Sequence, residues 1–178
     1  TQTDMMNSVS DISCVSGQMP RIVGLAYASK LYRNNKNLSD MENFSINGNE
    51  VVFGTIGDAS TSEGHFWEAI NACGVLQVPL IMSIWDDGYG ISVPSEYHTT
   101  RNDLSKALSG FQRSSKKENG YEIFTVHAWD YINLLKTYQK AEKLAREDHV
   151  PCIIHVKDVT QPQGLSLIHI SEPTRPSI

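Results

Sequence analysis

The hydrophobic positions of the chain fall into two alternating patterns. Residues 19–33 carry apolar side chains near helical spacing, and a polar run rich in asparagine follows, so we predict a helix that ends near residue 34. Short, nearly continuous apolar runs that are rich in β-branched residues predict buried strands. Strands are expected at residues 50–56, 79–85, 121–126 and 151–156.

The segments between these strands predict further helices. Ser62 is expected to cap a helix that runs toward Leu76, and Asp130 is expected to cap a helix that ends at about residue 147. Residues 92–120 are polar and are expected to form mainly a long loop, with a short helix at 102–108. Because helices alternate with short apolar strands, we predict an α/β fold, a doubly wound parallel sheet with helices on both faces.

Composition limits the size of the domain and its partners. A chain of 178 residues with 40% hydrophobic content suits a single domain with one sizeable core. The net charge is −5 and no basic block is present, so we expect protein and small-molecule partners, with no nucleic acid and no membrane. Cys14, Cys73 and Cys152 form no CxxC motif, and we expect buried free thiols in a reducing compartment: bacterial cytoplasm, or the mitochondrial matrix if the protein is eukaryotic.

Both ends of the chain are expected to be truncated. The sequence starts at Thr1 without an initiator methionine. Residues 165–175 resemble one reading frame of a common sequencing adapter, so we interpret residues 165–178 as a non-native tail that replaces the native sequence after about Gly164. A genuine C-terminal strand is the alternative interpretation. The native domain fragment is therefore expected to cover residues 1–164.

Two acidic turns follow the first two predicted strands. Gly57 and Asp58 end one strand and are followed by small residues that open a helix, whose N-terminus attracts phosphate. A carboxylate beside a phosphate is repulsive unless a divalent cation lies between them, and magnesium commonly bridges protein carboxylates to phosphates. Asp87, after the next strand, is a second carboxylate at the same edge of the sheet. An ordinary helix cap at Asp58 and a plain turn at residues 86–88 are the alternative interpretation.

The combined stretches 57–71, 78–81 and 85–92 resemble a larger motif. They are similar to the thiamine-diphosphate motif of the first, decarboxylating component of pyruvate and branched-chain 2-oxo acid dehydrogenases, and the resemblance covers roughly residues 13–164. In that family a Gly-Asp-Gly strand end is followed by Asn-Asn and then by Gly-Tyr-x-Ile-Ser. This chain has Ala59 in place of the second glycine and Asp87 in place of an asparagine.

The resemblance implies a set of site residues for thiamine diphosphate and magnesium (Mg). Asp58 and Asp87 would bind the magnesium ion through their carboxylates, and Tyr89 through its backbone carbonyl. The positions expected to contact or line the cofactor are Ser13, Val15, Gly57, Asp58, Ala59, Ser60, Trp85, Asp87, Tyr89 and Gly90. The catalytic residue remains unknown, because the glutamate that activates the cofactor belongs to a pyrimidine-binding domain outside this chain.

The resemblance also implies an activity and partners. The protein would catalyse oxidative decarboxylation of a 2-oxo acid of the 2-oxoisovalerate or pyruvate type and transfer the acyl group to a lipoyl domain. Its partners would be a beta-type, pyrimidine-binding domain or subunit and a lipoyl-bearing acyltransferase, within an oligomer. The fragment alone is expected to be inactive. Two alternatives stay open: a transketolase-like or other thiamine-diphosphate enzyme, and a non-catalytic α/β interaction module in which Asp58 and Asp87 are structural caps.

We predict structural positions for three histidines of this chain. His98 and Arg101 lie in the polar segment and are expected to be solvated. His127 and His155 lie in or beside strands, where a hydrogen-bonded core histidine is expected.

Overall fold

Four parallel strands form the centre of the protein, and helices cover both faces of the sheet. The computed structural model describes residues 12–38 and 42–160. The helices are α1 (Met19–Asn34), α2 (Gly64–Leu76), α3 (Leu104–Ala107) and α4 (Tyr131–Asp148). The strands are β1 (Val52–Gly57), β2 (Leu80–Trp85), β3 (Tyr89–Gly90), β4 (Val93–Pro94), β5 (Glu122–His127) and β6 (Cys152–Lys157). Short 3₁₀ helices are η1 (Lys36–Leu38), η2 (Ala59–Ser62), η3 (Ser95–Tyr97), η4 (Thr100–Asn102) and η5 (Ser109–Phe111).

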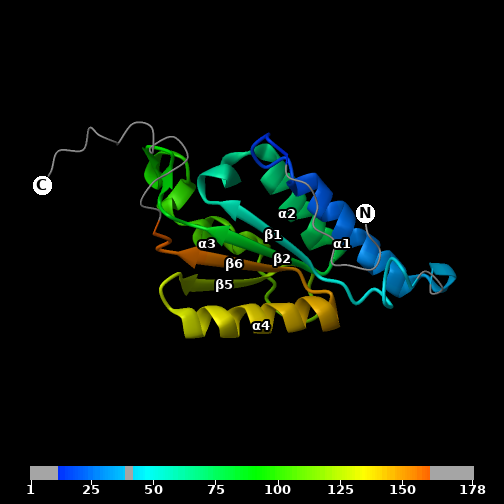
Figure 1. Ribbon diagram of the computed structural model, residues 1–178. Coiled ribbons are helices and arrows are strands. Elements are labelled where there is room, and N and C mark those ends of the chain that lie inside the picture. The colour runs from blue at the N-terminus through cyan, green and yellow to red at the C-terminus, as the bar shows by residue number, and fades with distance from the viewer. Residues whose placement is uncertain (1–11, 39–41, 161–178) are drawn as a thin grey trace, which may run out of the picture.

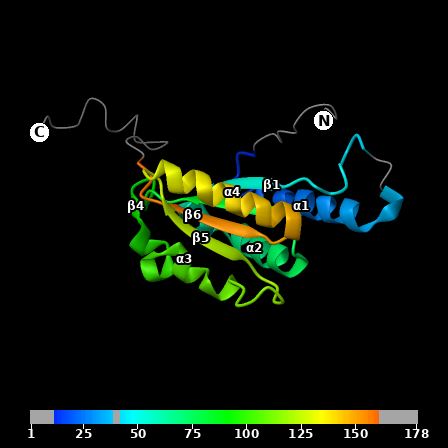
Figure 2. The ribbon, with the colours of Figure 1, turned by 90° about the horizontal axis from the view of Figure 1, so that it is seen from below.

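The strand order of the sheet is β1-β2-β6-β5, and every neighbouring pair is parallel. The chain moves in one direction from β1 through β2 to β5, with the connecting helices on one face, and then returns from β5 to β6 through α4. Because parallel crossovers are right-handed, this reversal places α4 on the opposite face. Figures 1 and 2 show α1 and α2 on one side of the sheet and α4 on the other, as the prediction of a doubly wound sheet required.

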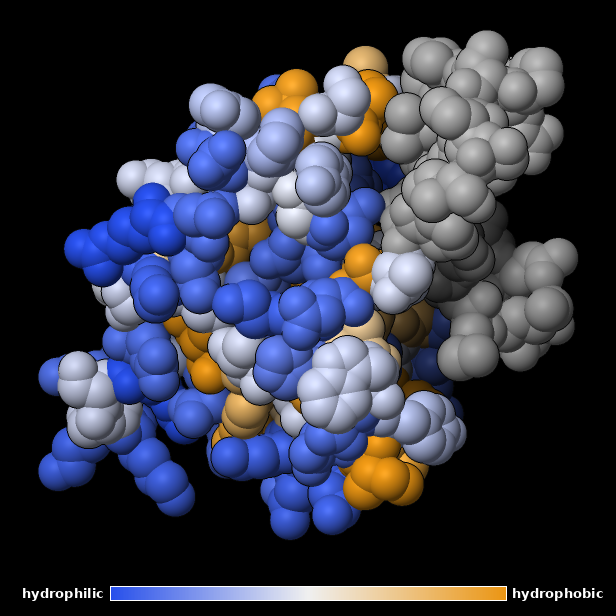
Figure 3. All heavy atoms as spheres, turned by 90° about the vertical axis from the view of Figure 1, so that its left-hand side faces the viewer, coloured by the Kyte–Doolittle hydropathy of each residue, from blue (hydrophilic) through white to orange (hydrophobic). Residues whose placement is uncertain are grey.

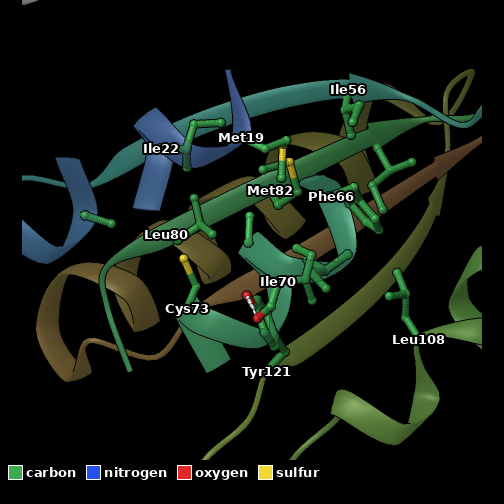
Figure 4. Close-up of a cluster of buried hydrophobic side chains, with 14 of the residues drawn as sticks. Met19, Ile22, Ile56, Phe66, Ile70, Cys73, Leu80, Met82, Leu108 and Tyr121 are labelled. Atoms are coloured by element: carbon green, nitrogen blue, oxygen red, sulfur yellow. Dashed lines mark hydrogen bonds between the residues drawn. The ribbon is translucent and has the colours of Figure 1, made fainter. Parts of the chain in front are cut away.

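Two hydrophobic clusters fill the spaces between these layers. The larger cluster joins α1, α2 and the segment containing α3 to one face of the sheet, and Phe66, Ile70 and Met82 lie in it fully buried. Figure 4 shows these side chains together with Tyr121, whose hydroxyl donates to the Ile70 carbonyl oxygen at 2.7 Å. The smaller cluster packs Ala141 and Ala145 of α4 against the other face. β2 and β6 are buried on both faces along almost their whole length, which confirms the interpretation of their apolar runs.

The predicted elements are confirmed within one or two residues at most boundaries, including Asp130 as the cap of α4, where it accepts from the Asn133 backbone N–H at 3.1 Å. The prediction that Ser62 caps α2 is wrong. Ser62 ends η2 and Glu63 is the N-cap residue of α2, because a turn of 3₁₀ helix first carries the chain away from the sheet edge. The polar segment 92–120 contains the short helix α3 at Leu104–Ala107 and three 3₁₀ helices. The two-stranded ribbon β3-β4 begins just before this segment.

Cys73 and Cys152 are buried free thiols, as predicted, but Cys14 is exposed, so the prediction of burial is wrong for that residue. Burial raises the pKa of both buried thiols to about 12. Within residues 12–38 and 42–160, no helix is both long and apolar enough to span a membrane. The proposed foreign tail, 165–178, lies outside the described residues.

Candidate cofactor and metal site

The carboxyl ends of the four parallel strands meet at one edge of the sheet. Gly57 pairs with Trp85, and Trp85 pairs with Val156, so Asp58 and Asp86 follow neighbouring strands directly. The Asp58 backbone N–H donates to the Trp85 carbonyl oxygen at 3.0 Å, and that of Asp86 donates to the Val156 carbonyl oxygen at 2.9 Å. Figure 3 views the protein from this end, which is mostly hydrophilic with separate hydrophobic side chains among the polar ones. Ligands of open parallel sheets bind at this edge.

Asp58 is buried with an unpaired carboxylate oxygen. The residue is only 3% exposed, and its Oδ2 has no hydrogen-bond partner among the described residues. Its backbone carbonyl, in contrast, accepts from the Thr61 N–H at 3.1 Å and from Thr61 Oγ1 at 2.5 Å. Burial, followed by the negative charges of Asp86 and Asp87, raises the pKa of Asp58 to about 7. A buried carboxylate of this kind is a site where a cation is favoured.

Both carboxylate oxygens of Asp86 are hydrogen-bonded, in contrast to Oδ2 of Asp58. His155 Nε2 donates to Asp86 Oδ2 at 2.7 Å, and the Gly88 N–H donates to Asp86 Oδ1 at 3.0 Å. The hydrogen bond from His155 holds the pKa of Asp86 below its ordinary value, so Asp86 is a carboxylate. The His155 ring is fully buried, and its Nδ1 lies 2.7 Å from Ser105 Oγ. This confirms the expectation of a hydrogen-bonded core histidine for His155.

His127 differs from that expectation. Its side chain is half exposed and its Nδ1 lies 2.5 Å from Asp158 Oδ2, so it belongs to a surface pair and the prediction of a core histidine is wrong. Because β5 is the edge strand of the sheet in the described residues, the carboxyl end of this strand is open to solvent.

Asp87 and Tyr89 lie in the turn after β2. Asp87 is half-buried, and its Oδ1 accepts from the Tyr89 N–H at 3.1 Å, which fixes the turn into β3. Tyr89 pairs with Pro94 in the ribbon β3-β4, and its ring is exposed. The charge of Asp87 contributes to the raised pKa of Asp58, and Gly90, which follows Tyr89, lies against Ala59, so this turn is near the end of β1. Their roles as magnesium ligands stay predictions.

Ala59 and Gly90 are packed against each other. A Cβ atom added to Gly90 would lie 2.7 Å from Cβ of Ala59, a distance at which one backbone segment must move. Ala59 is the residue that replaces a glycine of the family motif, so its extra methyl group fits only because position 90 has no side chain. Gly57, in contrast, has nothing nearer to an added Cβ than Ser60 Oγ at 3.9 Å.

We therefore predict that Gly90→Ala lowers the free energy of unfolding by about 1–3 kcal/mol, the usual cost of overpacking. The double variant Ala59→Gly, Gly90→Ala moves the methyl group to the other partner and is expected to recover most of that loss. Urea denaturation of the wild type, the two single variants and the double variant measures the coupling. Additive losses in the double variant would contradict the close contact.

The loop before α1 also reaches the motif. Ser16 Oγ donates to the Ser60 carbonyl oxygen at 2.8 Å, which ties this loop to η2. Ser13 and Val15, the two positions taken from the resemblance, are exposed. Ser16 is the residue of this loop that sequence reasoning missed; its positive φ of 58° and its burial are not visible in the sequence.

Trp85 points toward the face of the sheet that α4 covers. Its Nε1 donates to Ser83 Oγ at 2.9 Å, and that oxygen lies 2.6 Å from the Tyr138 hydroxyl. With Val51 and Phe53 the Trp85 ring lines an open groove of about 670 Å³ between β1 and α4. Its predicted contact with the cofactor stays a prediction.

His98 is not the solvated loop residue that was predicted. Its Nε2 is buried and lies 4.0 Å from Asp58 Oδ2. The short helix η3 folds back over η2, and Ser62 Oγ donates to the His98 carbonyl oxygen at 3.0 Å. Arg101 is exposed, as expected. The sequence offered no signal for His98, because its proximity to Asp58 depends on how this segment folds back.

The site fits a magnesium ion in its donor chemistry. Asp58 Oδ2 is a buried, unpaired carboxylate oxygen, and oxygen is the ligand atom that Mg²⁺ prefers. In the described ranges no group of three or more His, Cys, Asp or Glu side chains is arranged to hold a metal ion. Backbone carbonyl, water and diphosphate oxygens would therefore complete the coordination shell, which is how Mg²⁺ is usually bound.

The arrangement of sheet and helices is that of a transketolase-like α/β fold. The crystal structure of transketolase from Campylobacter jejuni superposes with a TM-score of 0.56 and 19% sequence identity, over 80% of this chain and 19% of that one. This similarity shows the fold alone.

The sequence identifies the family. The profile of the family described as "Dehydrogenase E1 component" matches residues 3–159, so the chain belongs to this thiamine-diphosphate-dependent family, and the resemblance to alpha-type components of 2-oxo acid dehydrogenases is confirmed. 2-Oxoisovalerate dehydrogenase subunit alpha of Bacillus subtilis is 27% identical over 82% of this chain and 38% of the relative. The mitochondrial subunit alpha of Caenorhabditis elegans is 32% identical over 70% of this chain and 26% of the relative. The chain thus spans less than half the length of these relatives.

Proposed function

We propose that this chain supplies the diphosphate- and magnesium-binding site of the first component of a 2-oxo acid dehydrogenase that acts on a 2-oxo acid of the 2-oxoisovalerate or pyruvate type. The observation that carries the proposal is the buried carboxylate of Asp58, whose Oδ2 is unpaired at the carboxyl end of β1. Burying an unpaired carboxylate is costly, and a bound cation removes that cost. The similarity to subunit alpha of 2-oxoisovalerate dehydrogenases supports the choice of substrate class.

Each residue at this edge has a role in the proposed site. Asp58 and Asp87 would hold the magnesium ion with their carboxylates, and Tyr89 with its carbonyl oxygen. Gly57, Ala59 and Ser60 would present backbone N–H groups to the diphosphate at the start of η2. Ser13, Val15, Trp85 and Gly90 would line the rest of the cofactor.

When bound, thiamine diphosphate supplies the electron sink for decarboxylation of the 2-oxo acid. The residues of this chain bind and orient the diphosphate end, and the Asp58 carboxylate offsets the charge of the cation. Asp86, held as a carboxylate by His155, adds a second negative charge beside Asp58, which strengthens the attraction for a divalent cation.

Partners complete the proposed enzyme. The relatives are named as alpha subunits, which supports a beta-type, pyrimidine-binding partner and an oligomer. Large apolar side chains are exposed on several elements and are available for such contacts. They include Leu25, Tyr27, Leu31, Phe53, Val75, Trp85, Trp129, Tyr131, Ile132 and Leu135. Acyl transfer to a lipoyl-bearing acyltransferase is the last step that we propose.

The experiment that tests this function is calorimetric titration of thiamine diphosphate into the intact protein that carries this chain, assembled with its pyrimidine-binding partner, with and without Mg²⁺. We expect binding that requires Mg²⁺ and that weakens about 100-fold, or ~2.7 kcal/mol, in Asp58→Ala. Asp58→Ala removes the buried carboxylate that the cation needs.

Asp158→Ala is the matched control. Asp158 follows β6 at the same edge of the sheet, but its side chain is 60% exposed and pairs with His127. This variant is expected to bind the cofactor like the wild type. Magnesium-independent binding, or equal losses in both variants, would refute the site.

A further inference from the structure

A chain of four hydrogen-bonded side chains runs from the surface to the cofactor edge of the sheet. Thr125 Oγ1 of β5 lies 2.8 Å from Ser105 Oγ of α3, which lies 2.7 Å from His155 Nδ1. His155 Nε2 donates to Asp86 Oδ2 at 2.7 Å. His155 is fully buried, whereas Thr125 is exposed. The chain therefore links the segment that contains α3 to the carboxylate beside Asp58.

The direction of these hydrogen bonds follows from the carboxylate. Asp86 can only accept, so in the neutral His155 ring the proton is on Nε2 and Nδ1 carries a lone pair. Among the described residues, the Ser105 hydroxyl is the group that donates to this lone pair. The Ser105 oxygen in turn accepts from the Thr125 hydroxyl. Both nitrogens of a fully buried imidazole are thus paired, which fixes the orientation of the ring toward Asp86.

The position of Ser105 is itself fixed by the packing of α3 against the sheet. Asp103 caps α3 and accepts from Lys157 Nζ, at the end of β6, at 2.9 Å. Leu104 and Leu108 are buried in the larger hydrophobic cluster, and Figure 4 shows Leu108 at its edge. Ser105 lies in the same short helix, so these contacts hold its hydroxyl against the histidine ring of β6.

We propose that Ser105 is a positioning residue for the cofactor site, which holds the imidazole of His155, and through it the carboxylate of Asp86, in the orientation that binding requires. This inference rests on the cofactor site of the proposed function. Ser105 acts through His155, because its hydroxyl contacts one ring nitrogen and Asp86 is bonded to the other. Loss of the hydroxyl leaves a buried ring nitrogen without its donor. Outer groups that orient a binding residue in this way typically contribute about 10–100-fold to affinity.

The test compares Ser105→Thr with Ser105→Val, two side chains of the same shape of which only threonine keeps the hydroxyl. Thiamine diphosphate is titrated calorimetrically with Mg²⁺ into the intact, partnered protein. We expect about tenfold weaker binding for Ser105→Val and nearly wild-type binding for Ser105→Thr. Ser109→Val is the matched control and should bind like the wild type, because the exposed Ser109 hydroxyl donates to the Lys106 carbonyl oxygen at 2.9 Å, close to its own position in the chain. Ser105→Ala, which adds no atoms, replaces the valine variant if that variant does not fold.

A double-mutant cycle separates positioning from packing. If Ser105 acts through His155, Ser105→Val causes no further loss of affinity in a protein that already carries His155→Leu. An equal further loss in that background, equal losses in Ser105→Thr and Ser105→Val, or wild-type binding by Ser105→Val overturns the role of Ser105 and leaves the cofactor site intact. A wild type that does not bind thiamine diphosphate with Mg²⁺ overturns the proposed function and the positioning role together.

Discussion

Asp58→Asn is expected to stabilise the protein at pH 8 in the absence of metal and cofactor, by about 2 kcal/mol. The folded protein raises the pKa of Asp58 from 3.8 to about 7, so between these values it retains a proton that the unfolded chain has lost. Stability therefore falls as the pH rises from about 4 to about 7, by about 1.4 kcal/mol per pH unit at most, and remains reduced above 7. Asparagine removes the charge that causes this loss.

Thermal or urea denaturation at pH 5 and pH 8 measures the effect. At pH 5 the wild-type carboxyl is largely protonated, so the stabilising effect of the substitution should shrink. Saturating Mg²⁺ and thiamine diphosphate should reverse the order at pH 8, because only the wild type gains from cation binding. A stability difference that is the same at both pH values would mean that the charge of Asp58 is not the cause. The buried charge of Asp58 thus lowers the stability of the protein without metal, and it is the same charge that we propose to bind the cation.

His155→Leu is expected to lower the free energy of unfolding at pH 7 by about 3 kcal/mol. The substitution leaves the carboxylate of Asp86 partly buried and without the hydrogen bond from Nε2. Removal of the hydrogen-bond partner of a buried carboxylate costs more than the hydrogen bond itself contributes, because the charge remains buried. The His155 hydrogen bond lowers the pKa of Asp86, so its contribution is present above the ordinary value of 3.8 and is lost as the pH falls through the lower folded value.

His127→Leu is the matched control for this prediction. His127 and Asp158 form the same kind of pair at 2.5 Å, but their side chains are 50% and 60% exposed. Exposed pairs contribute about 0–1 kcal/mol, so this variant should unfold at nearly the wild-type urea concentration. Equal losses in the two leucine variants would show that burial of Asp86 does not set the cost. The cation affinity of the His155 variant should also change, since Asp86 lies beside Asp58.

The regular elements were predictable because their signals are local. The apolar run that became β2 is buried at five consecutive positions, and such a run indicates a strand that is covered on both faces. The Asp130 cap is also a local signal, made within one turn of helix. In α1, among the apolar side chains near helical spacing, Ile22 and Ala26 are buried, but Tyr27 and Leu31 are exposed. The spacing of a stripe indicates a face, and tertiary packing decides how much of that face is covered.

From the sequence, the relative positions of site residues could be predicted only for those that directly follow a strand. The Gly57-Asp58 end and the acidic turn after β2 are adjacent because their strands are neighbours, which the family motif implied. The resemblance assigned a role to Asp87, but no sequence pattern assigned one to Asp86. In the structure His155 binds Asp86 across a separation of 69 residues, while Asp87 accepts from the backbone N–H of Tyr89 in its own turn.

The sequence by itself determined the order of helices and strands and the family, because hydrophobic periodicity and a contiguous motif are properties of neighbouring residues. Only the tertiary structure decided that β6 lies between β2 and β5, which brings His155 to Asp86, and that η3 folds back to place His98 opposite Asp58. The same periodic pattern is compatible with other strand orders and other loop paths. Contacts across long separations depend on which of these arrangements buries the most apolar surface and leaves the fewest unpaired polar groups, and that is settled by the whole fold.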